Sequence, residues 1–209
     1  MFLLLALSSS VANPRLKSAR MGCVDNLKEL GTAYRLWGND NGGHYPDAVP
    51  VSQGGWADYV ARPDAPAVAW TNYLILESGG TNLSELLACP TDERRPARGI
   101  PALTNLSYFI GADADDPYPQ SFLGGDRNLG AGAVPKDDYG YSPADGKGSN
   151  VFLRGPACWS LKMHRAGGNI LLGDGSVQQI SSRNLNPNWL ITGQGHASPT
   201  NAPAHLLFP

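Results

Sequence analysis

The sequence predicts an α+β fold in which a long N-terminal helix packs on a small antiparallel sheet, with a loop-rich middle. Three observations lead to this prediction. Apolar residues recur at helical spacing over residues 15–37, and an Asp-Gly pair joins two apolar runs between residues 169 and 180. Residues 111–149 between them are rich in Gly, Asp and Pro. A long helix followed by antiparallel strands is typical of the α+β class.

The composition limits the number of domains and the kinds of partner. The chain has 209 residues, enough for one substantial core, with a formal net charge of -2 and only 16% charged residues. Such a chain lacks the basic surface that neutralises nucleic-acid phosphates, so no nucleic-acid partner is expected. We divide it into an N-terminal helix, residues 1–38, and a globular α+β domain, residues 39–209.

The apolar run at the N-terminus, Phe2 to Leu7, is shorter than the about 20 residues that a membrane-spanning helix needs. Ser10 and Ala12 resemble a small-residue signal-peptide cleavage site, but no basic segment precedes the run. By itself this stretch therefore predicts no membrane span, and a very short signal peptide is the alternative.

Residues 15–37 are predicted to form one amphipathic helix, because apolar side chains recur every three or four residues while charged ones occupy other faces. Residues 38–43, Gly-Asn-Asp-Asn-Gly-Gly, end it with the residues that left-handed caps and turns favour. A helix that began near residue 1 would be roughly 55 Å long, so part of it is expected to project from the domain. The apolar positions are Leu16, Ala19, Cys23, Leu27, Leu30, Tyr34 and Trp37.

The remainder reads as short helices followed by strands. Residues 69–80 and 82–90 are predicted to be helical, the first ended by glycines and the second by Pro90. The clearest strand signal is the hairpin formed by residues 169–172 and 176–180 around Gly173-Asp174-Gly175. Further strands are predicted at 103–110, 150–155 and 158–164, and a final short helix at 181–193.

His164 and Asp174 invite a catalytic and a structural interpretation. A hydrolase would use them as a base and its orienting partner, with Cys158 as nucleophile, but no GxSxG elbow is present and nothing marks Cys158 as activated. In the structural interpretation Asp174 stabilises the turn, Gly175 takes a positive φ, and His164 on the preceding strand bonds to backbone. We favour the structural interpretation, because no nucleophile on a strained turn is evident.

Two further groups of residues suggest binding. Asp113, Asp115 and Asp116 offer hard oxygen ligands for Ca²⁺, but they lack the glycine and glutamate of an EF-hand, and acidic loops are most often simply solvated. Calcium is the one cofactor that the sequence suggests, and we expect that the protein requires no cofactor. Scattered aromatic residues allow sugar stacking, although core packing is the default. These residues are Tyr45, Trp56, Tyr59, Trp70, Tyr73 and Trp159.

The three cysteines, Cys23, Cys89 and Cys158, have no close paired spacing and no CxxC, so no metal cluster is predicted. In an oxidising compartment they allow one disulfide and one free thiol. Spacing alone does not assign the pair.

Several segments match, in order, the motifs of one known family. His164, Asp174 and Gly175 fit an H-x9-DG signature without a gap. A helix that leads to an aromatic–proline element corresponds to residues 22–47, GCVDNLKELGTAYRLWGNDNGGHYPD. A C-P-[ST]-D turn corresponds to residues 88–96, ACPTDERRP, and the central segment of the family corresponds to residues 107–128, SYFIGADADDPYPQSFLGGDRN. Over most of residues 15–182 the chain therefore resembles the type IV pilin-like and type II secretion pseudopilin-like proteins with a C-terminal H-x9-DG domain.

The resemblance implies a non-enzymatic subunit of an envelope fibre or type II secretion-like pseudopilus, which assembles with identical or different subunits through its N-terminal helix. It implies a place in the cell envelope, anchored in the inner membrane or displayed in the periplasm or outside. Cys23 and Cys89 lie in matching segments, so they are the favoured disulfide; two buried thiols are the alternative. A calcium site known in major pseudopilins adds weight to Asp113, Asp115 and Asp116.

The sequence departs from this prepilin-type family at its start. Family members begin with a cleaved, methylated segment and a long apolar run, of which only FLLLAL has a counterpart here. We expect that the true start lies upstream; a truncated sequence or a lost anchor are alternatives. If the frame begins at Met1, a soluble extracytoplasmic module that binds calcium, glycan or an envelope protein becomes the alternative function. A secreted hydrolase using Cys158 or His164 is the second alternative.

Overall fold

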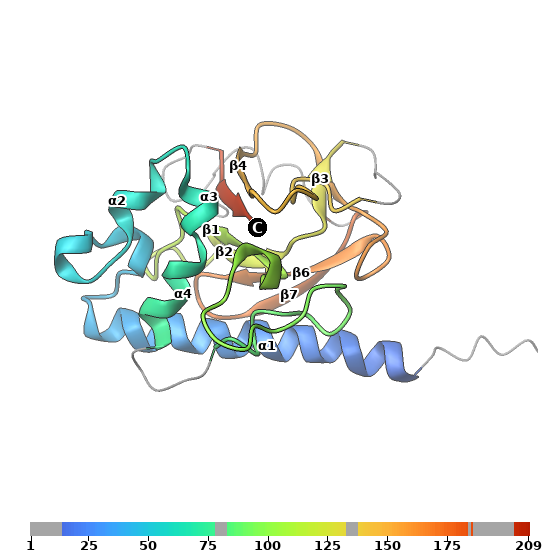
Figure 1. The fold of residues 1–209 in the computed structure, drawn as a ribbon, viewed down its shortest axis with the longest axis horizontal. Helices are drawn as coiled ribbons and strands as arrows, with labels where there is room; N and C mark the ends of the chain where they lie inside the picture. Colours follow the sequence, from blue (N-terminus) through green and yellow to red (C-terminus); the bar gives the residue numbers. More distant parts are fainter. Residues whose placement is uncertain (1–13, 78–82, 133–137, 184, 186–202) are drawn as a thin grey trace, which may run out of the picture.

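The computed structural model describes residues 14–77, 83–132, 138–183, 185 and 203–209, and it has the predicted α+β architecture (Figure 1). The helical elements are α1 (Pro14–Asp40), η1 (Pro46–Ala48), η2 (Val51–Gln53), α2 (Ala57–Val60), α3 (Ala65–Val68), α4 (Trp70–Glu77) and η3 (Leu103–Asn105). The strands are β1 (Tyr108–Gly111), β2 (Phe122–Asp126), β3 (Leu129–Ala131), β4 (Ser149–Phe152), β5 (Ala157–Trp159), β6 (Gly167–Leu172), β7 (Val177–Ser181) and β8 (His205–Phe208).

The main sheet has six strands in the order β4-β8-β1-β2-β6-β7, and every neighbouring pair is antiparallel. The C-terminal strand β8 lies inside the sheet, where Leu207 pairs with Ile110 of β1 on one side and Asn150 of β4 on the other. Strands β3 and β5 form a separate two-stranded ribbon. The end of the chain therefore completes the sheet rather than extending from it.

The four inner strands of this sheet, β8, β1, β2 and β6, are buried on both faces, whereas the edge strands β4 and β7 are partly exposed. Successive side chains on a strand point to opposite faces, so Ile110 and Leu171 join the core beneath α1 while Phe109 and Ile170 join a second core. Trp159 of the β3–β5 ribbon belongs to that second core. In Figure 1, α1 lies below the sheet and β3 above it. Burial on both faces explains why Ile170, Leu171 and Leu172 of β6 are apolar in succession rather than alternating with polar residues.

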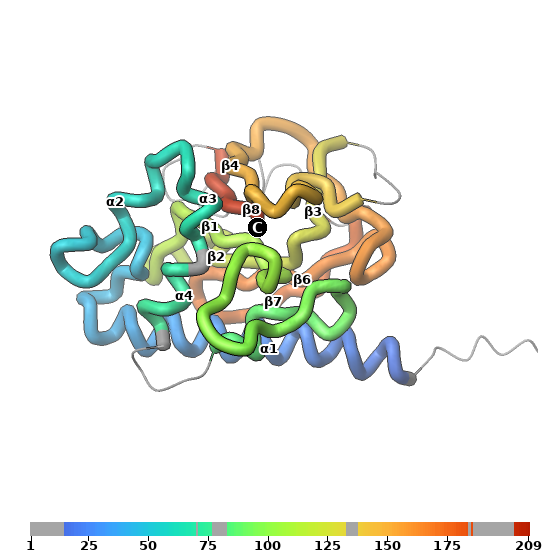
Figure 2. The backbone as a smooth tube through the Cα atoms, viewed as in Figure 1, coloured from blue at the N-terminus to red at the C-terminus, as the bar shows by residue number. Residues whose placement is uncertain are grey.

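Helix α1 is unbroken over 27 residues, about 40 Å at 1.5 Å per residue. Cys23, Leu27 and Leu30 on its inner side are at most 1% exposed. Gly31 permits the close approach of the sheet, because a Cβ there would lie 2.8 Å from Leu171 Cδ1. Residues 15–18 are exposed, and in the tube view the N-terminal end of α1 extends past the sheet (Figure 2). The helix is thus part of the core over most of its length and free of it at its start.

The structure differs from the sequence-based expectation in several short elements. Residues 83–90 form turns rather than a helix, because the apolar stretch is too short for a stable isolated helix and Leu87 O instead accepts a hydrogen bond from Ser107 N. The expected loop at 111–149 contains β2 and β3. Strand β2 is rich in glycine, and a Cβ at Gly125 would lie 2.7 Å from the Phe109 ring, so close packing overrides low strand propensity. Most of the predicted helix at 181–193 lies outside the described residues.

Candidate functional site

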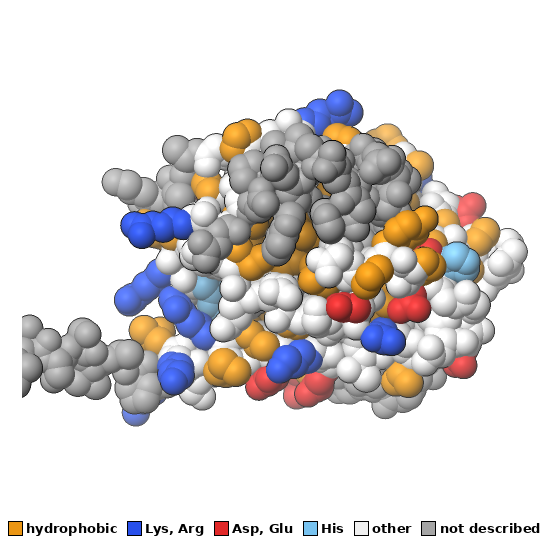
Figure 3. All heavy atoms as spheres, turned by 180° about the vertical axis from the view of Figure 1, so that it is seen from behind, with side chains coloured by type: hydrophobic (Ala, Val, Ile, Leu, Met, Phe, Trp, Pro, Cys, Tyr) orange, Lys and Arg blue, Asp and Glu red, His pale blue; other side chains and the backbone are white. Residues whose placement is uncertain are grey.

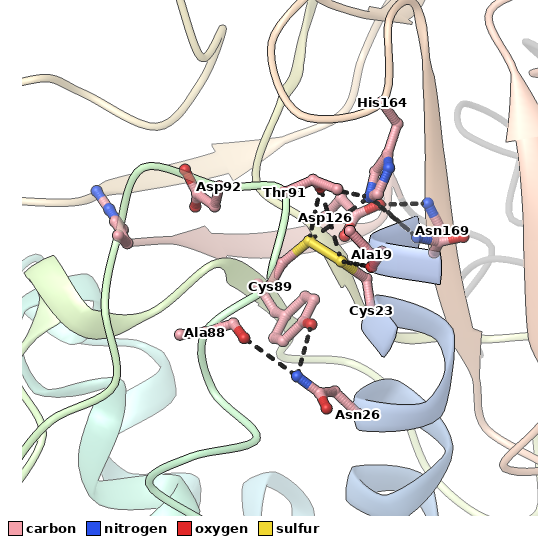
Figure 4. The surroundings of a disulfide bond; sticks show 12 residues. Ala19, Cys23, Asn26, Ala88, Cys89, Thr91, Asp92, Asp126, His164 and Asn169 are labelled. Atoms are coloured by element: carbon pink, nitrogen blue, oxygen red, sulfur yellow. Dashed lines mark hydrogen bonds and ion pairs between the residues drawn. A yellow bond between two sulfur atoms is a disulfide. The ribbon is translucent and has the colours of Figure 1, made fainter. Parts of the chain in front are cut away.

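A buried cluster of sulfur and polar side chains lies where α1 meets the sheet (Figure 4). Cys23 of α1 and Cys89 of the C-P-T-D turn form a disulfide, as predicted, and Cys158 is free and buried. The hydroxyl oxygen of Thr91 lies 3.0 Å from Cys89 Sγ and 3.7 Å from Cys23 Sγ. The disulfide therefore ties the helix to the turn that precedes the sheet.

His164 reaches this cluster from the loop between β5 and β6. The expectation that it stands on a strand and bonds to backbone is wrong: residues 161–166 form turns, and its imidazole contacts side chains. Its Nε2 atom lies 3.1 Å from Asp126 Oδ2, 3.3 Å from Asn169 Nδ2 and 3.7 Å from Cys89 Sγ. The side chain is 5% exposed, so these contacts are made almost out of water.

Asp126 at the end of β2 is fully buried. Its Oδ2 atom accepts hydrogen bonds from Asn169 N at 2.6 Å and Asn169 Nδ2 at 2.9 Å, and it also faces His164. Its Oδ1 atom has no hydrogen-bond partner within the described part of the chain. A buried carboxylate oxygen without a partner carries a free-energy cost, which marks this position as incompletely satisfied.

The loop that carries His164 is strained. Met163, Arg165 and Ala166 have φ values of 56°, 54° and 60°, and non-glycine residues rarely adopt this left-handed region. Two polar side chains hold the loop in place: Arg20 of α1 donates to His164 O at 2.9 Å, and Asn128 Nδ2 donates to the carbonyl oxygen of residue 162 at 2.9 Å. Backbone strain is retained only where surrounding contacts enforce it, so the position of His164 is imposed by tertiary structure.

An open cavity of about 260 Å³ adjoins the cluster. Arg20, His164, Arg165, Asn169 and Gln179 are among its lining residues. The cavity brings solvent to the edge of His164 although the imidazole itself is buried.

A buried ion pair lies next to the cluster. The guanidinium of Arg127 donates to both carboxylate oxygens of Asp92, at 2.7 and 2.9 Å, and the two side chains are 3% and 0% exposed. The Arg127 guanidinium also stacks 3.3 Å from the centroid of the Tyr139 ring. Burial alone would raise the pKa of Asp92, but the hydrogen bonds and charge of Arg127 bring it below its usual value. Asp92 is the last residue of the C-P-T-D turn, so this pair fixes that turn to the sheet.

The Asp174-Gly175 turn is structural in the way the sequence predicts. Asp174 Oδ1 accepts a hydrogen bond from Ser176 N at 2.8 Å, and Gly175 has a φ of 81°. The turn also docks on α1, since Arg35 donates to Asp174 O at 2.7 Å. His164 and Asp174 lie at opposite ends of β6, about 20 Å apart for a strand of this length. The structure therefore does not bring them together as a catalytic pair.

The three acidic residues proposed for calcium each bond within the protein. Asp115 Oδ1 accepts from Tyr45 N at 2.9 Å, Asp116 Oδ1 accepts from the Tyr45 hydroxyl at 3.3 Å, and Asp113 Oδ2 accepts from His205 N at 2.9 Å. Among the described residues they do not form a set of three carboxylates whose oxygens all lie within 4.8 Å. Calcium binding stays a prediction.

Asp47 is a functional candidate that sequence reasoning missed. It is 6% exposed, and neither of its side-chain oxygens has a hydrogen-bond partner in the described structure. Burial raises the pKa of Asp47 well above its usual value, and the charges of Asp115 and Asp113 raise it further. Only its place beside Tyr45-Pro46 in the sequence gave any signal. Asp126, Arg127 and Asn169 were also missed, although the first two lie in the matched segment 107–128.

Cys158 and most of the aromatic candidates lie in the core, and Tyr59 is partly buried against it. Cys158 lies in β5, and burial raises the pKa of its thiol, the opposite of what activates a nucleophile. Four of the aromatic residues considered for sugar stacking, Tyr45, Trp56, Tyr73 and Trp159, are at most 3% exposed. Their faces are used for packing.

The chain matches no protein-family model, no curated protein and no solved structure. Its function is therefore inferred from the residues and their geometry.

Proposed function

We propose that this protein is a non-enzymatic pilin-like or pseudopilin-like subunit of an envelope fibre, and that it assembles through the outer face of α1. The observation that carries the proposal is that this helix has both a buried face and exposed apolar side chains. One face is buried in the core, whereas Met21 and Leu36 on other faces are 43% and 59% exposed. Leu16 continues the core-facing stripe and is 42% exposed, because it lies in the part of the helix that extends past the sheet. Exposed apolar side chains on a long surface helix suit contact with a helix of a neighbouring subunit.

The distribution of charge supports an orientation toward a membrane. Lys and Arg side chains gather at the end of the molecule where α1 begins (Figure 3), and Arg15, Lys17 and Arg165 are exposed. Basic residues near an anionic lipid surface each contribute about 1 kcal/mol to binding. None of the helices in the described ranges has the length and apolar content that a bilayer crossing demands. In this proposal the basic end faces the inner membrane and the domain is displayed on its outer side.

The disulfide supports a place outside the cytoplasm, because disulfides persist mainly in oxidising compartments. The partners of the protein would be copies of this chain or related pilin-like subunits, with no nucleic acid involved.

Sedimentation velocity over a range of concentrations tests the assembly. We expect concentration-dependent self-association of the purified chain, weakened by Leu16→Glu and by Met21→Glu. The matched control is Ile100→Glu, which changes a side chain that is 75% exposed but lies outside α1. A chain that remains monomeric throughout, or one that Ile100→Glu affects as strongly as the α1 variants, would contradict assembly through this helix.

The second candidate is a soluble extracytoplasmic binding module, and one observation favours its calcium form. Asp113 and Asp115 lie near enough to the unpartnered Asp47 for their charges to raise its pKa. A cation would relieve this repulsion between carboxylates. Two results together would favour this function over assembly. The chain would stay monomeric, and millimolar Ca²⁺ would raise the melting temperature of the wild type but not that of Asp47→Asn.

A further inference from the structure

We propose that Cys23, Cys89 and His164 bind one zinc ion when the disulfide is reduced, with Asp126 as the fourth ligand. This site goes beyond the proposed function and does not depend on assembly. Spacing in the sequence gave no indication of it, because the three residues are far apart in the chain and meet only in the fold (Figure 4).

The ligand atoms already lie close together. Among the described residues, the Sγ atoms of Cys23 and Cys89 and a ring nitrogen of His164 are the one group of three or more His, Cys, Asp or Glu ligand atoms that lie within 4.8 Å of one another. All three residues are buried. Two sulfurs and an imidazole nitrogen are ligands that zinc prefers, and the carboxylate of Asp126, beside His164, is available as a fourth ligand.

Two distances between these atoms match the edges of a zinc tetrahedron. With zinc bonds of about 2.3 Å to sulfur and about 2.0–2.1 Å to nitrogen and oxygen, a tetrahedron has edges of about 3.5 Å between sulfur and nitrogen and about 3.3 Å between nitrogen and oxygen. The corresponding distances are 3.7 Å from Cys89 Sγ to His164 Nε2 and 3.1 Å from His164 Nε2 to Asp126 Oδ2. Two changes complete the tetrahedron. The two sulfurs separate to about 3.8 Å when their bond is broken, and the Asp126 carboxylate and the sulfurs come closer together, because Asp126 is not among the ligand atoms that all lie within 4.8 Å of one another.

The surroundings supply what a metal site needs beyond its ligands. Asp126 has a buried oxygen without a hydrogen-bond partner, and Asn169 holds its other oxygen in place. Thr91 lies within reach of both sulfurs and can donate a hydrogen bond to a thiolate. The cavity lined by Arg20 and His164 gives an ion a path from solvent.

The disulfide and the zinc site exclude each other, because each sulfur either bonds to the other sulfur or to the metal. A thiol–disulfide exchange with a dithiol converts one form to the other. One thiolate of the dithiol attacks a cysteine sulfur and breaks the protein disulfide, and its second thiol then closes the reagent into its own disulfide. Two electrons pass to the protein, leaving two thiols, and zinc binding releases their two protons.

Either state joins α1 to the C-P-T-D turn. Before the chain meets an oxidising compartment, zinc would therefore hold the same two elements that the disulfide holds afterwards. Metal binding to the folded state stabilises it by mass action, so the site makes stability of the reduced chain dependent on zinc.

Cobalt serves as the spectroscopic probe for this site. The purified chain is reduced with a phosphine without oxygen and titrated with Co²⁺, and thiolate-to-cobalt absorption is followed before Zn²⁺ is added. We expect one equivalent of Co²⁺ on the reduced wild type, its displacement by Zn²⁺, and no binding to the disulfide form. His164→Gln and Asp126→Asn are expected to weaken binding at least about tenfold. The control Cys158→Ala removes the free cysteine and should bind as the wild type does.

Folding is monitored in the same samples by near-ultraviolet circular dichroism. If the reduced chain loses structure without metal, Zn²⁺ should restore the wild-type spectrum but not that of His164→Gln. The proposal is overturned if the reduced wild type binds no Co²⁺, or if His164→Gln binds it as tightly and refolds as fully as the wild type. Neither result bears on self-association, so failure of this site and failure of assembly are distinguishable.

Discussion

Removal of the disulfide is expected to cost about 4 kcal/mol of folding free energy. The bond joins residues 66 positions apart, and the chain-entropy relation for a closed loop of this length gives about 4 kcal/mol at 25 °C. Replacing both cysteines by alanine, Cys23→Ala with Cys89→Ala, opens this loop in the unfolded state. Both positions are at most 1% exposed, so lost packing adds to the cost. For a chain of this size the melting temperature should fall by roughly 8–16 °C.

Urea unfolding followed by circular dichroism measures the change. Cys158→Ala is the control, because it removes a buried thiol without opening a loop, and it should cost about 1 kcal/mol or less. A thiol titration of the unfolded wild type should find one free thiol before reduction and three afterwards. If the double variant lost less than about 1 kcal/mol, or if the unreduced wild type showed three free thiols, the bond would not be closing this loop.

Three further predictions concern single positions. Asp92→Asn leaves the buried charge of Arg127 without its partner and should cost about 3–5 kcal/mol in urea unfolding. Because the folded-state pKa of Asp92 is lowered, the pair stabilises the protein above about pH 3.9 and this stabilisation is lost as the pH falls through the folded-state pKa. The variant should lack that part of the acid dependence, and an unchanged acid profile would contradict it. Gly175→Ala forces a side chain into a φ of 81° and places its Cβ 3.1 Å from Cδ of Arg35 on α1. It should therefore destabilise more than Gly132→Ala, at φ 65° with open space around it, which should cost about 1 kcal/mol. Equal melting temperatures for the two glycine variants would argue against docking of the turn. Asp47→Asn should raise the free energy of unfolding at pH 7 by about 1 kcal/mol or more. The reason is that burial raises the folded-state pKa of Asp47. The neutral carboxyl therefore stabilises the fold below about pH 3.9, and this contribution is lost as the pH rises through the folded-state pKa. A variant less stable than the wild type at pH 7 would refute this.

Patterns among neighbouring residues were sufficient to predict α1 and the β6–β7 hairpin. The spacing of apolar residues along 15–37 predicted α1, which the structure extends to Pro14–Asp40, because a helix buries one stripe of side chains. Gly173-Asp174-Gly175 predicted the hairpin of β6 and β7, because a tight turn needs residues that accept a positive φ. The resemblance to pilin-like proteins favoured the Cys23–Cys89 bond, which the structure contains.

Strands that depend on distant partners escaped prediction. Gly124 and Gly125 of β2 have low strand propensity, and at Gly125 only a residue without a side chain leaves room for the ring of Phe109. Strand β8 carries no turn signal of its own, and its place between β4 and β1 follows from pairing across more than 50 residues of chain.

The sequence by itself determined the long helix, the Asp-Gly hairpin and the α+β class, since each follows from the periodicity or turn chemistry of neighbouring residues. The tertiary structure alone decided that His164 would meet Asp126 and the two cysteines, and that Asp92 would meet Arg127. These contacts join residues 35 or more positions apart, and their energy comes from burial and charge in a shared interior, which no local pattern encodes.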